Sequence, residues 1–160
     1  MSQLPRVIES VWGYPRPPRI ESCAHHLVVE FGGRVIAETR RGWRVCETSH
    51  PPTYYFPRAD VLADALLDAP GRSLCEWKGA AVYFDVASGG ERAPRAAWAY
   101  PDPTPEAAGM SGHVAFYCAA MDRCLVDGEV ARPQPGGFYG GWVTSLVRGP
   151  FKGAPGTMGW

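Results

Sequence analysis

The chain turns a corner at Glu47-Thr48-Ser49-His50-Pro51-Pro52-Thr53-Tyr54-Tyr55-Phe56-Pro57, and the rest of the fold is predicted to be arranged around it. A predicted strand, residues 43–48, ends here because Pro51 and Pro52 have no N–H for a sheet and fix their own φ. Each proline also holds the residue before it in extended geometry. Glu47 and His50 therefore stand where a strand gives way to a stiff loop, which predicts a functional site at this corner.

Short runs rich in Val and Ile on both sides of the corner predict strands. Residues 26–31 and 34–39 flank Gly32-Gly33, which is typical of a β-hairpin. Residues 43–48 would add the third strand of that meander. Further strands are predicted at 73–77, 80–86, 93–100, 113–119 and 124–126, and the last is followed by the hairpin signal Asp127-Gly128.

Residues 57–69 carry the spacing of a helix. Pro57 suits a first helical turn, and Pro70-Gly71 would end the element. One apolar face is formed at helical intervals by Val61, Leu62, Ala65, Leu66 and Ala69. The predicted fold is therefore α+β and mainly β, with curved antiparallel sheets and one main helix.

The length of 160 residues predicts one domain with two extensions. Residues 1–23 read as a proline-rich, extended N-terminal arm, and residues 24–131 as the β-rich core. Residues 132–160 form a tail of Gly, Pro and aromatic residues that is too apolar for a flexible linker. We expect this tail to pack on its own domain or on the partner subunit of a homodimer.

The composition argues against several classes of partner. The formal net charge is zero, so the sequence shows no electrostatic footprint for nucleic acid or anionic membrane. Apolar runs are shorter than the ~18 residues of a membrane span, and the N-terminus lacks a secretory signal pattern. Five cysteines without paired spacing favour a reduced, cytoplasmic compartment. The absence of asparagine and the presence of only two lysines, Lys78 and Lys152, indicate a GC-rich genome and make Lys78 unusual within this chain.

Polar and aromatic residues near strand ends and Pro or Gly breaks predict one pocket, because side chains there leave the sheet and line loops. A carboxylate, an imidazole and an ammonium could exchange protons once their pKa values are tuned, and the candidate catalytic residues are Glu47, His50 and Lys78. Indole and phenol rings would form the apolar wall or hold a cation, and the candidates are Tyr54, Tyr55, Trp77, Tyr83, Trp98 and Tyr100. The expected ligand is small and polar or anionic, and neither a cofactor nor a metal is predicted.

Each candidate has a structural alternative. Glu47 could be a surface acid paired with Arg41 or Arg44, and His50 a loop histidine bonded to backbone. Lys78 could simply occupy a turn, and the aromatic residues could belong to the core. Cys46, near His50, lies in an apolar strand where a thiol usually packs and stays inert.

Metal-binding patterns are weak. Cys23, His25 and His26 have ligand-like spacing, yet a second ligand pair does not follow. Cys118 and Cys124 lie six residues apart and read as separate strand or turn positions.

Four ordered motifs resemble the domain of unknown function 427 family. They are the corner quoted above, Cys75-Glu76-Trp77-Lys78-Gly79-Ala80-Ala81-Val82-Tyr83, Ala97-Trp98-Ala99-Tyr100-Pro101-Asp102-Pro103 and His113-Val114-Ala115-Phe116-Tyr117. The resemblance covers about residues 24–130 and is that of an actinobacterial-type member. The family usually has proline where this chain has Glu76, which puts the turn geometry there in doubt.

The resemblance implies a compact, mainly β domain close to the β-tent group. A label attached to the family relates it to nucleotidyltransferases. This chain lacks the Gly-Ser and paired-Asp pattern of a metal-held nucleotide, and Asp85 has no carboxylate two residues away. The resemblance therefore informs the fold more than the chemistry.

Two functions follow from the sequence. The first is a small-molecule pocket between sheets in which Glu47, His50 and Lys78 orient a polar ligand, with or without acid–base turnover. The alternative is a non-catalytic interaction module that uses the aromatic tail and a sheet edge. Convergence of the three polar residues in one cleft would favour the pocket, and their dispersal would favour the module.

Overall fold

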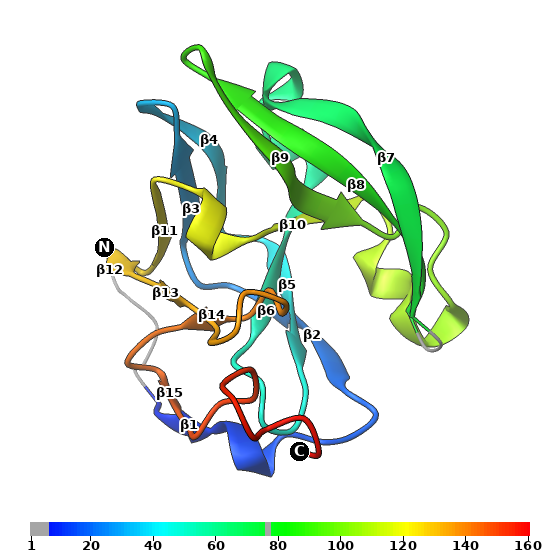
Figure 1. Cartoon of the computed structure of the whole chain (residues 1–160), viewed down its shortest axis with the longest axis vertical. Coiled ribbons are helices and arrows are strands. Elements are labelled where there is room, and N and C mark those ends of the chain that lie inside the picture. The colour runs from blue at the N-terminus through cyan, green and yellow to red at the C-terminus, as the bar shows by residue number, and fades with distance from the viewer. Residues whose placement is uncertain (1–6, 76–77) are drawn as a thin grey trace.

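A computed structural model describes residues 7–75 and 78–160, and its largest element is an antiparallel seven-stranded sheet (Figure 1). In spatial order its strands are β2 (Arg19–Cys23), β5 (Gly42–Cys46), β6 (Thr53–Pro57), β10 (His113–Phe116), β9 (Glu91–Ala99), β8 (Gly79–Ser88) and β7 (Leu66–Cys75). A second, four-stranded sheet contains β12 (Glu129–Val130), β11 (Arg123–Val126), β3 (Leu27–Phe31) and β4 (Arg34–Thr39). The mainly β prediction is thus confirmed.

Two short strand pairs and five 3₁₀ turns complete the secondary structure of the described residues. β1 (Glu9–Ser10) runs parallel to β15 (Val147–Arg148), and β13 (Arg132–Pro133) runs antiparallel to β14 (Trp142–Val143). The 3₁₀ turns are η1 (Val11–Gly13), η2 (Arg58–Asp60), η3 (Ala63–Ala65), η4 (Pro105–Met110) and η5 (Cys118–Ala120). Within residues 7–75 and 78–160, the structure contains no helix with the length and apolar character needed to cross a membrane.

The helix predicted over residues 57–69 is wrong. Pro57 ends strand β6, and η2 and η3 are separate turns joined by extended backbone at Val61 and Leu62. Val61 forms a bridge with Ala37, and the Leu62 N–H donates to the Ile36 carbonyl at 2.8 Å. Long-range pairing with β4 therefore overrides the local helical spacing.

The predicted hairpin around Gly32-Gly33 is confirmed, because β3 and β4 pair antiparallel on either side of it. The strand after it does not extend that meander. β5 pairs with β2 and β6 in the other sheet, so the prediction of a third meander strand is wrong. The hairpin at Asp127-Gly128 is confirmed by the pairing of β11 with β12.

The main core lies between the two sheets, and a second apolar cluster covers the other face of the large sheet. The period-2 alternation of a strand divides residues between them. In β6, Tyr54 and Phe56 enter the main core, whereas Tyr55 belongs to the second cluster. In β9, Ala97 faces the core and Trp98 faces outward to the second cluster. The second cluster is the floor on which the candidate site is built.

β1 and η1 of the arm lie beside β15 and the C-terminal end of the chain at one end of the molecule (Figure 1). The parallel pair β1–β15 joins them, and the Trp12 and Trp160 rings meet edge to face at a centroid distance of 5.1 Å. Trp142, from the tail, is fully buried in the main core and its indole N–H donates to the Phe116 carbonyl at 3.2 Å.

Candidate functional site

A hollow of about 530 Å³ lies where the second apolar cluster meets the corner at residues 47–52. The polar groups of its lining come from Glu47, His50 and Lys78, together with Gln134 and Lys152 of the tail. Its other lining residues are Val45, Pro51, Thr53, Tyr55, Ser73, Tyr83, Trp98, Tyr100, Tyr117, Phe138, Tyr139 and Gly140. Among the predicted pocket residues that the structure describes, all except Tyr54 line this hollow.

Tyr54 is placed elsewhere by strand alternation. It is buried in the main core, where its ring packs against Trp142 at a centroid distance of 5.2 Å. Its neighbour Tyr55 points to the opposite face and lines the hollow. Tyr54 therefore lies apart from the hollow that the other predicted residues line. Trp77 lies outside the residues that the structure describes.

The corner is held between the two ends of the chain. From the arm, the carbonyl of Val11 accepts from the Ser49 N–H at 3.1 Å. From the tail, the Lys152 N–H donates to the Ser49 carbonyl at 2.8 Å, and the Trp142 N–H donates to the Pro52 carbonyl at 2.9 Å. Ser49 has a φ of 71°, an uncommon and strained value for a residue with a side chain. These backbone bonds hold that conformation and fix the direction of the next side chain, His50.

His50 is mostly buried, and polar groups surround its ring. Nδ1 lies 3.0 Å from the Gln134 amide nitrogen, and Nε2 lies 4.0 Å from a carboxylate oxygen of Glu47. The Tyr139 ring packs edge to face on the imidazole at a centroid distance of 4.8 Å. Burial lowers the pKa of His50, the Glu47 carboxylate opposes this shift, and the positive charges of Lys152 and Arg16 reinforce it. A neutral imidazole is therefore the expected form near pH 7.

Glu47 also faces Arg16, whose Nε lies 3.7 Å from a carboxylate oxygen. The pairing with Arg41 or Arg44 that the sequence left open is absent among the described side chains. Arg41 instead binds Asp60, and Arg44 binds Glu9 and Glu21. The carboxylate of Glu47 is thus turned toward the hollow rather than toward the neighbouring strand positions.

An aromatic wall closes the outer face of the sheet. The Trp98 indole N–H donates to the Tyr55 hydroxyl at 3.3 Å, and the Trp98 ring packs on Tyr117 at 4.5 Å. The ammonium of Lys78 lies 5.5 Å from the Tyr100 ring centroid, within the range of a cation–π contact. The wall therefore offers flat apolar surfaces with a positive charge at its rim.

A comparison with protein-family models finds a match to a domain of unknown function (DUF427) over residues 19–127. The chain belongs to the DUF427 family. The resemblance of the four sequence motifs is confirmed by this match. A search of curated proteins found none that matches.

Part of the site of this DUF427 protein lies beyond the family match. Gln134, Tyr139, Gly140 and Lys152 follow residue 127 and line one side of the hollow. A Cβ on Gly140 would overlap the Trp98 ring, so only glycine allows the tail to pass this close. These residues are not among those that the sequence predicted to form the pocket.

Two signals could have found the tail residues. Lysine is rare in this chain, and Lys152 is the second of only two lysines. The rarity that makes Lys78 unusual therefore makes Lys152 equally unusual. In addition, the run Gly136-Gly137-Phe138-Tyr139-Gly140-Gly141 sets two aromatic residues between glycine pairs. Such a run is typical of a loop that packs closely on a ring or on backbone.

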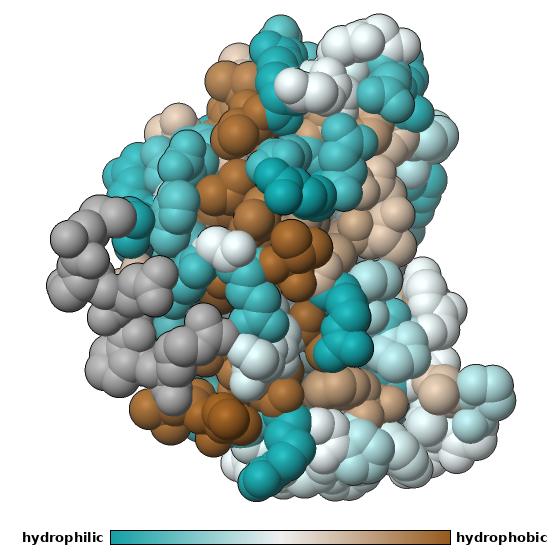
Figure 2. Space-filling model, turned by 90° about the vertical axis from the view of Figure 1, so that its left-hand side faces the viewer, coloured by the Kyte–Doolittle hydropathy of each residue, from teal (hydrophilic) through white to brown (hydrophobic). Residues whose placement is uncertain are grey.

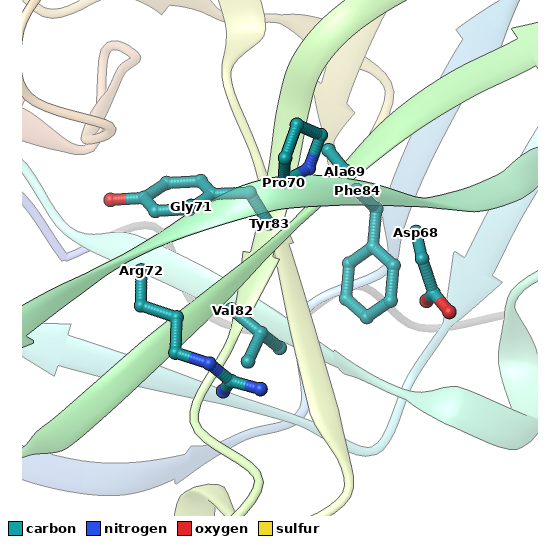
Figure 3. A pocket seen from close by; sticks show the side chains of 8 residues that line it. All are labelled: Asp68, Ala69, Pro70, Gly71, Arg72, Val82, Tyr83 and Phe84. Carbon is teal, nitrogen blue, oxygen red and sulfur yellow. The ribbon is translucent and has the colours of Figure 1, made fainter.

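A second hollow, of about 370 Å³, lies at the Pro70-Gly71 bulge of β7 (Figure 3). Figure 3 shows the Tyr83 ring on one side of β8 and the Val82 and Phe84 side chains on the other. Its charged residues, Asp68 and Arg72, are solvent exposed. Because its charged groups are in water rather than converging in a buried space, this hollow is the weaker candidate.

The cysteine and metal alternatives find no support in the described part of the chain. Burial raises the pKa of Cys46 to about 11, which keeps its thiol protonated and inert. His25 does not face a metal site with Cys23, because its Nδ1 lies 2.6 Å from an Asp127 carboxylate oxygen. Residues 7–75 and 78–160 contain no group of three or more His, Cys, Asp or Glu side chains placed to hold a metal ion.

Asp85 likewise has a structural role in this DUF427 protein. Its carboxylate accepts from the Arg92 guanidinium at 2.6 Å and from the Arg95 backbone N–H at 2.9 Å. The Arg95 N–H and the Arg92 guanidinium lower the pKa of Asp85. These bonds tie the carboxylate to β9 beside the register shift between β8 and β9.

Proposed function

We propose that this DUF427 domain binds a small polar or anionic organic molecule in the hollow beside the corner. The observation that carries the proposal is the presence of Glu47, His50 and Lys78 in the lining of one hollow with an aromatic wall. Its volume of about 530 Å³ falls within the range of roughly 300–1,000 Å³ typical of small-molecule sites.

The charges favour an anionic or strongly hydrogen-bond-accepting ligand. Among the described lining residues, two ammonium groups, those of Lys78 and Lys152, stand against one carboxylate, that of Glu47. Lys152 is anchored, because its Nζ donates to the Trp160 carbonyl at 3.2 Å and lies 5.7 Å from the Tyr139 ring centroid. A ring of the ligand would stack on Trp98 or Tyr100 while its anionic group meets a lysine.

Acid–base chemistry on the bound molecule is the catalytic form of this proposal. Glu47 and His50 lie close enough to act on the same ligand atom or on two adjacent atoms. Burial favours the neutral form of His50 near pH 7, and a neutral imidazole can donate a hydrogen bond or accept a proton on its unprotonated nitrogen. Lys78 would hold the anionic or carbonyl group during such a step.

The test is a binding titration with defined probes. Phenyl phosphate and benzoate, with neutral benzamide for comparison, are added to the ¹⁵N-labelled chain while the Trp98 indole N–H and the His50 ring signals are followed by NMR. The two anions should shift both signals in the millimolar range or below, and benzamide should shift them less. If neither anion shifts these signals at about 10 mM, any binding is weaker than roughly −3 kcal/mol, and the proposal is wrong.

Variants separate binding from stability. Lys78→Ala and His50→Ala should each weaken binding of phenyl phosphate at least fivefold while changing the melting temperature little. Arg123→Ala is the matched control, because this exposed cation pairs with Glu30 on the four-stranded sheet and is absent from the hollow's lining. A large loss of melting temperature in both site variants would instead indicate structural roles.

A second candidate function is protein–protein interaction through exposed apolar side chains. Met158 and Phe138 in the tail and Trp12 in the arm are exposed. Figure 2 shows apolar surface on one face as several pieces separated by hydrophilic ones. Light scattering across a hundredfold concentration range tests it: a concentration-dependent dimer that Met158→Ser abolishes would favour this function, and a constant monomer mass would exclude the homodimer.

A further inference from the structure

The side-chain amide of Gln134 has its orientation fixed by backbone groups on both sides. Its nitrogen donates to the Lys152 carbonyl at 2.8 Å, and its oxygen accepts from the Gly141 N–H at 3.1 Å. A backbone carbonyl can only accept and a backbone N–H can only donate, so a flipped amide would lose both bonds. Gln134 is only 3% exposed, so water does not compete for these bonds.

The fixed amide determines which nitrogen of His50 carries the proton. The same Gln134 nitrogen lies 3.0 Å from His50 Nδ1. Because that nitrogen has only hydrogen to offer, Nδ1 must be the acceptor, and the proton of the neutral imidazole must reside on Nε2.

The protonated nitrogen lies on the side of the ring nearest Glu47. Nε2 lies 4.0 Å from the nearest Glu47 oxygen, which is too long for a direct hydrogen bond. The His50 and Glu47 side chains both line the hollow, so an acceptor atom of a ligand there can accept a hydrogen bond from Nε2–H. Three charged groups from separate segments affect the pKa of the His50 ring, and they are Glu47 in the corner, Arg16 in the arm and Lys152 in the tail.

We propose that Gln134 is a positioning residue that sets His50 as an Nε2–H donor, so that the ligand atom facing His50 is a carbonyl, carboxylate or phosphoryl oxygen. The choice of ligand atom rests on the proposed function, whereas the tautomer is a property of the free protein. This tautomer gives His50 and Glu47 different roles. His50 donates a hydrogen bond to the ligand, and the Glu47 carboxylate remains the group that can accept one.

The support around Gln134 is specific to its position. A Cβ on Gly141 would lie 2.7 Å from the Gln134 side-chain oxygen, so glycine is needed for this backbone N–H to reach the amide. The segment after Gln134 also packs closely on the tail at Gly153, where added side chains would meet backbone. The tail is therefore folded so that one buried amide meets the corner's imidazole.

The tautomer can be read by long-range ¹H–¹⁵N correlation of the histidine rings in the full chain without ligand at pH 7.5, with His50 assigned from its loss in His50→Gln. We expect a single Nε2–H form in the wild type. Gln134→Glu replaces the donor by an acceptor, so it should move the proton to Nδ1 and raise the pKa of His50 by about one unit or more. Gln134→Met, which removes the amide, should give a mixture of tautomers.

The outcomes separate this inference from the proposed function. An Nδ1–H form in the wild type, or an unchanged single Nε2–H form in folded Gln134→Glu, overturns the role of Gln134 even if phenyl phosphate binds. Binding of phenyl phosphate that leaves the His50 Nε2–H signal unmoved overturns the assigned ligand atom. If Gln134→Glu fails to fold, the wild-type and Gln134→Met spectra decide, and identical tautomer patterns in the two would overturn the inference.

Discussion

Replacing Trp142 tests whether the tail is part of the folding unit. This residue lies beyond the family match, yet it is 0% exposed and packs on Tyr54 and Phe56 at centroid distances of 5.2 and 6.1 Å. Its indole N–H and its backbone N–H also bond to the Phe116 and Pro52 carbonyls. It therefore joins the tail to the main core and to the corner.

The expected loss follows from this burial. Truncation of a fully buried Trp to Ala costs about 3–5 kcal/mol, as lost transfer free energy plus the cavity that remains. Trp142→Phe keeps most of the apolar contact but removes the indole N–H, which should cost about 1–3 kcal/mol. For a chain of this length, the Ala variant should lower the melting temperature by about 6 to 20 °C.

Urea unfolding followed by circular dichroism measures both values, provided that the transition stays two-state. Phe138→Ala is the matched control, because this aromatic residue lies in the same tail but is 75% exposed, and its change should stay within about 0.5 kcal/mol. If Trp142→Ala unfolds within about 0.5 kcal/mol of the wild type, the tail does not contribute to the core as the packing indicates, and the reasoning is refuted.

Three further predictions concern the corner, the close approach of the tail and the arm. Burial places the pKa of folded His50 below its ordinary value of 6.5. The unfolded chain therefore binds the His50 proton more tightly than the folded chain does. As a result, the unfolding free energy should fall as the pH drops from about 6.5 through the folded-state pKa. His50→Gln should remove this part of the slope in urea titrations from pH 5 to 8, and equal slopes in the two proteins would contradict it. Gly140→Ala should lower the free energy of unfolding by about 1–3 kcal/mol in thermal unfolding, because its new Cβ would overlap the Trp98 ring. Gly159→Ala is the control and should have little effect, because Gly159 has open space around it. Equal losses in the two variants would exclude the overlap as the cause. Arg44→Met should lower the free energy of unfolding by about 1.5–3 kcal/mol, because the Arg44 side chain is 13% exposed and its guanidinium bonds to Glu9 and Glu21. Arg123→Met should cost less than about 1 kcal/mol, because the Arg123 side chain is 52% exposed. Comparable losses in urea unfolding would show that burial does not decide the strength of these ion pairs.

Local patterns predicted most strands but not their partners. The runs on either side of Gly32-Gly33 form β3 and β4 because a two-residue turn with adjacent strands is a local device. β5 instead joins β2 and β6, a choice made by contacts that a single strand does not reveal. The helical spacing of residues 57–69 failed for the same reason. Val61, Ala65 and Leu66 are buried as that spacing requires, but β4 pairs with the segment and keeps it extended.

The candidate site shows the same limit. Breaks at Pro51 and Gly79 marked where side chains leave the sheet, and His50 and Lys78 beside them line the hollow. Side chains alternate between the two faces of β6, so Tyr54 and Tyr55 lie on opposite faces, and the sequence prediction placed both in the pocket. The contributions of Gln134 and Lys152 depend on tail contacts across more than eighty residues of sequence, which spacing alone does not encode.

The split origin of the hollow has a consequence for how such domains diversify. Twelve of the lining residues lie within the segment that matches the DUF427 family model, and five come from the loop-rich extension that follows it. Replacing that extension would change the shape and charge of the cavity while leaving the strand framework untouched. Exchange of a single terminal segment would therefore alter which molecules fit the hollow of this chain.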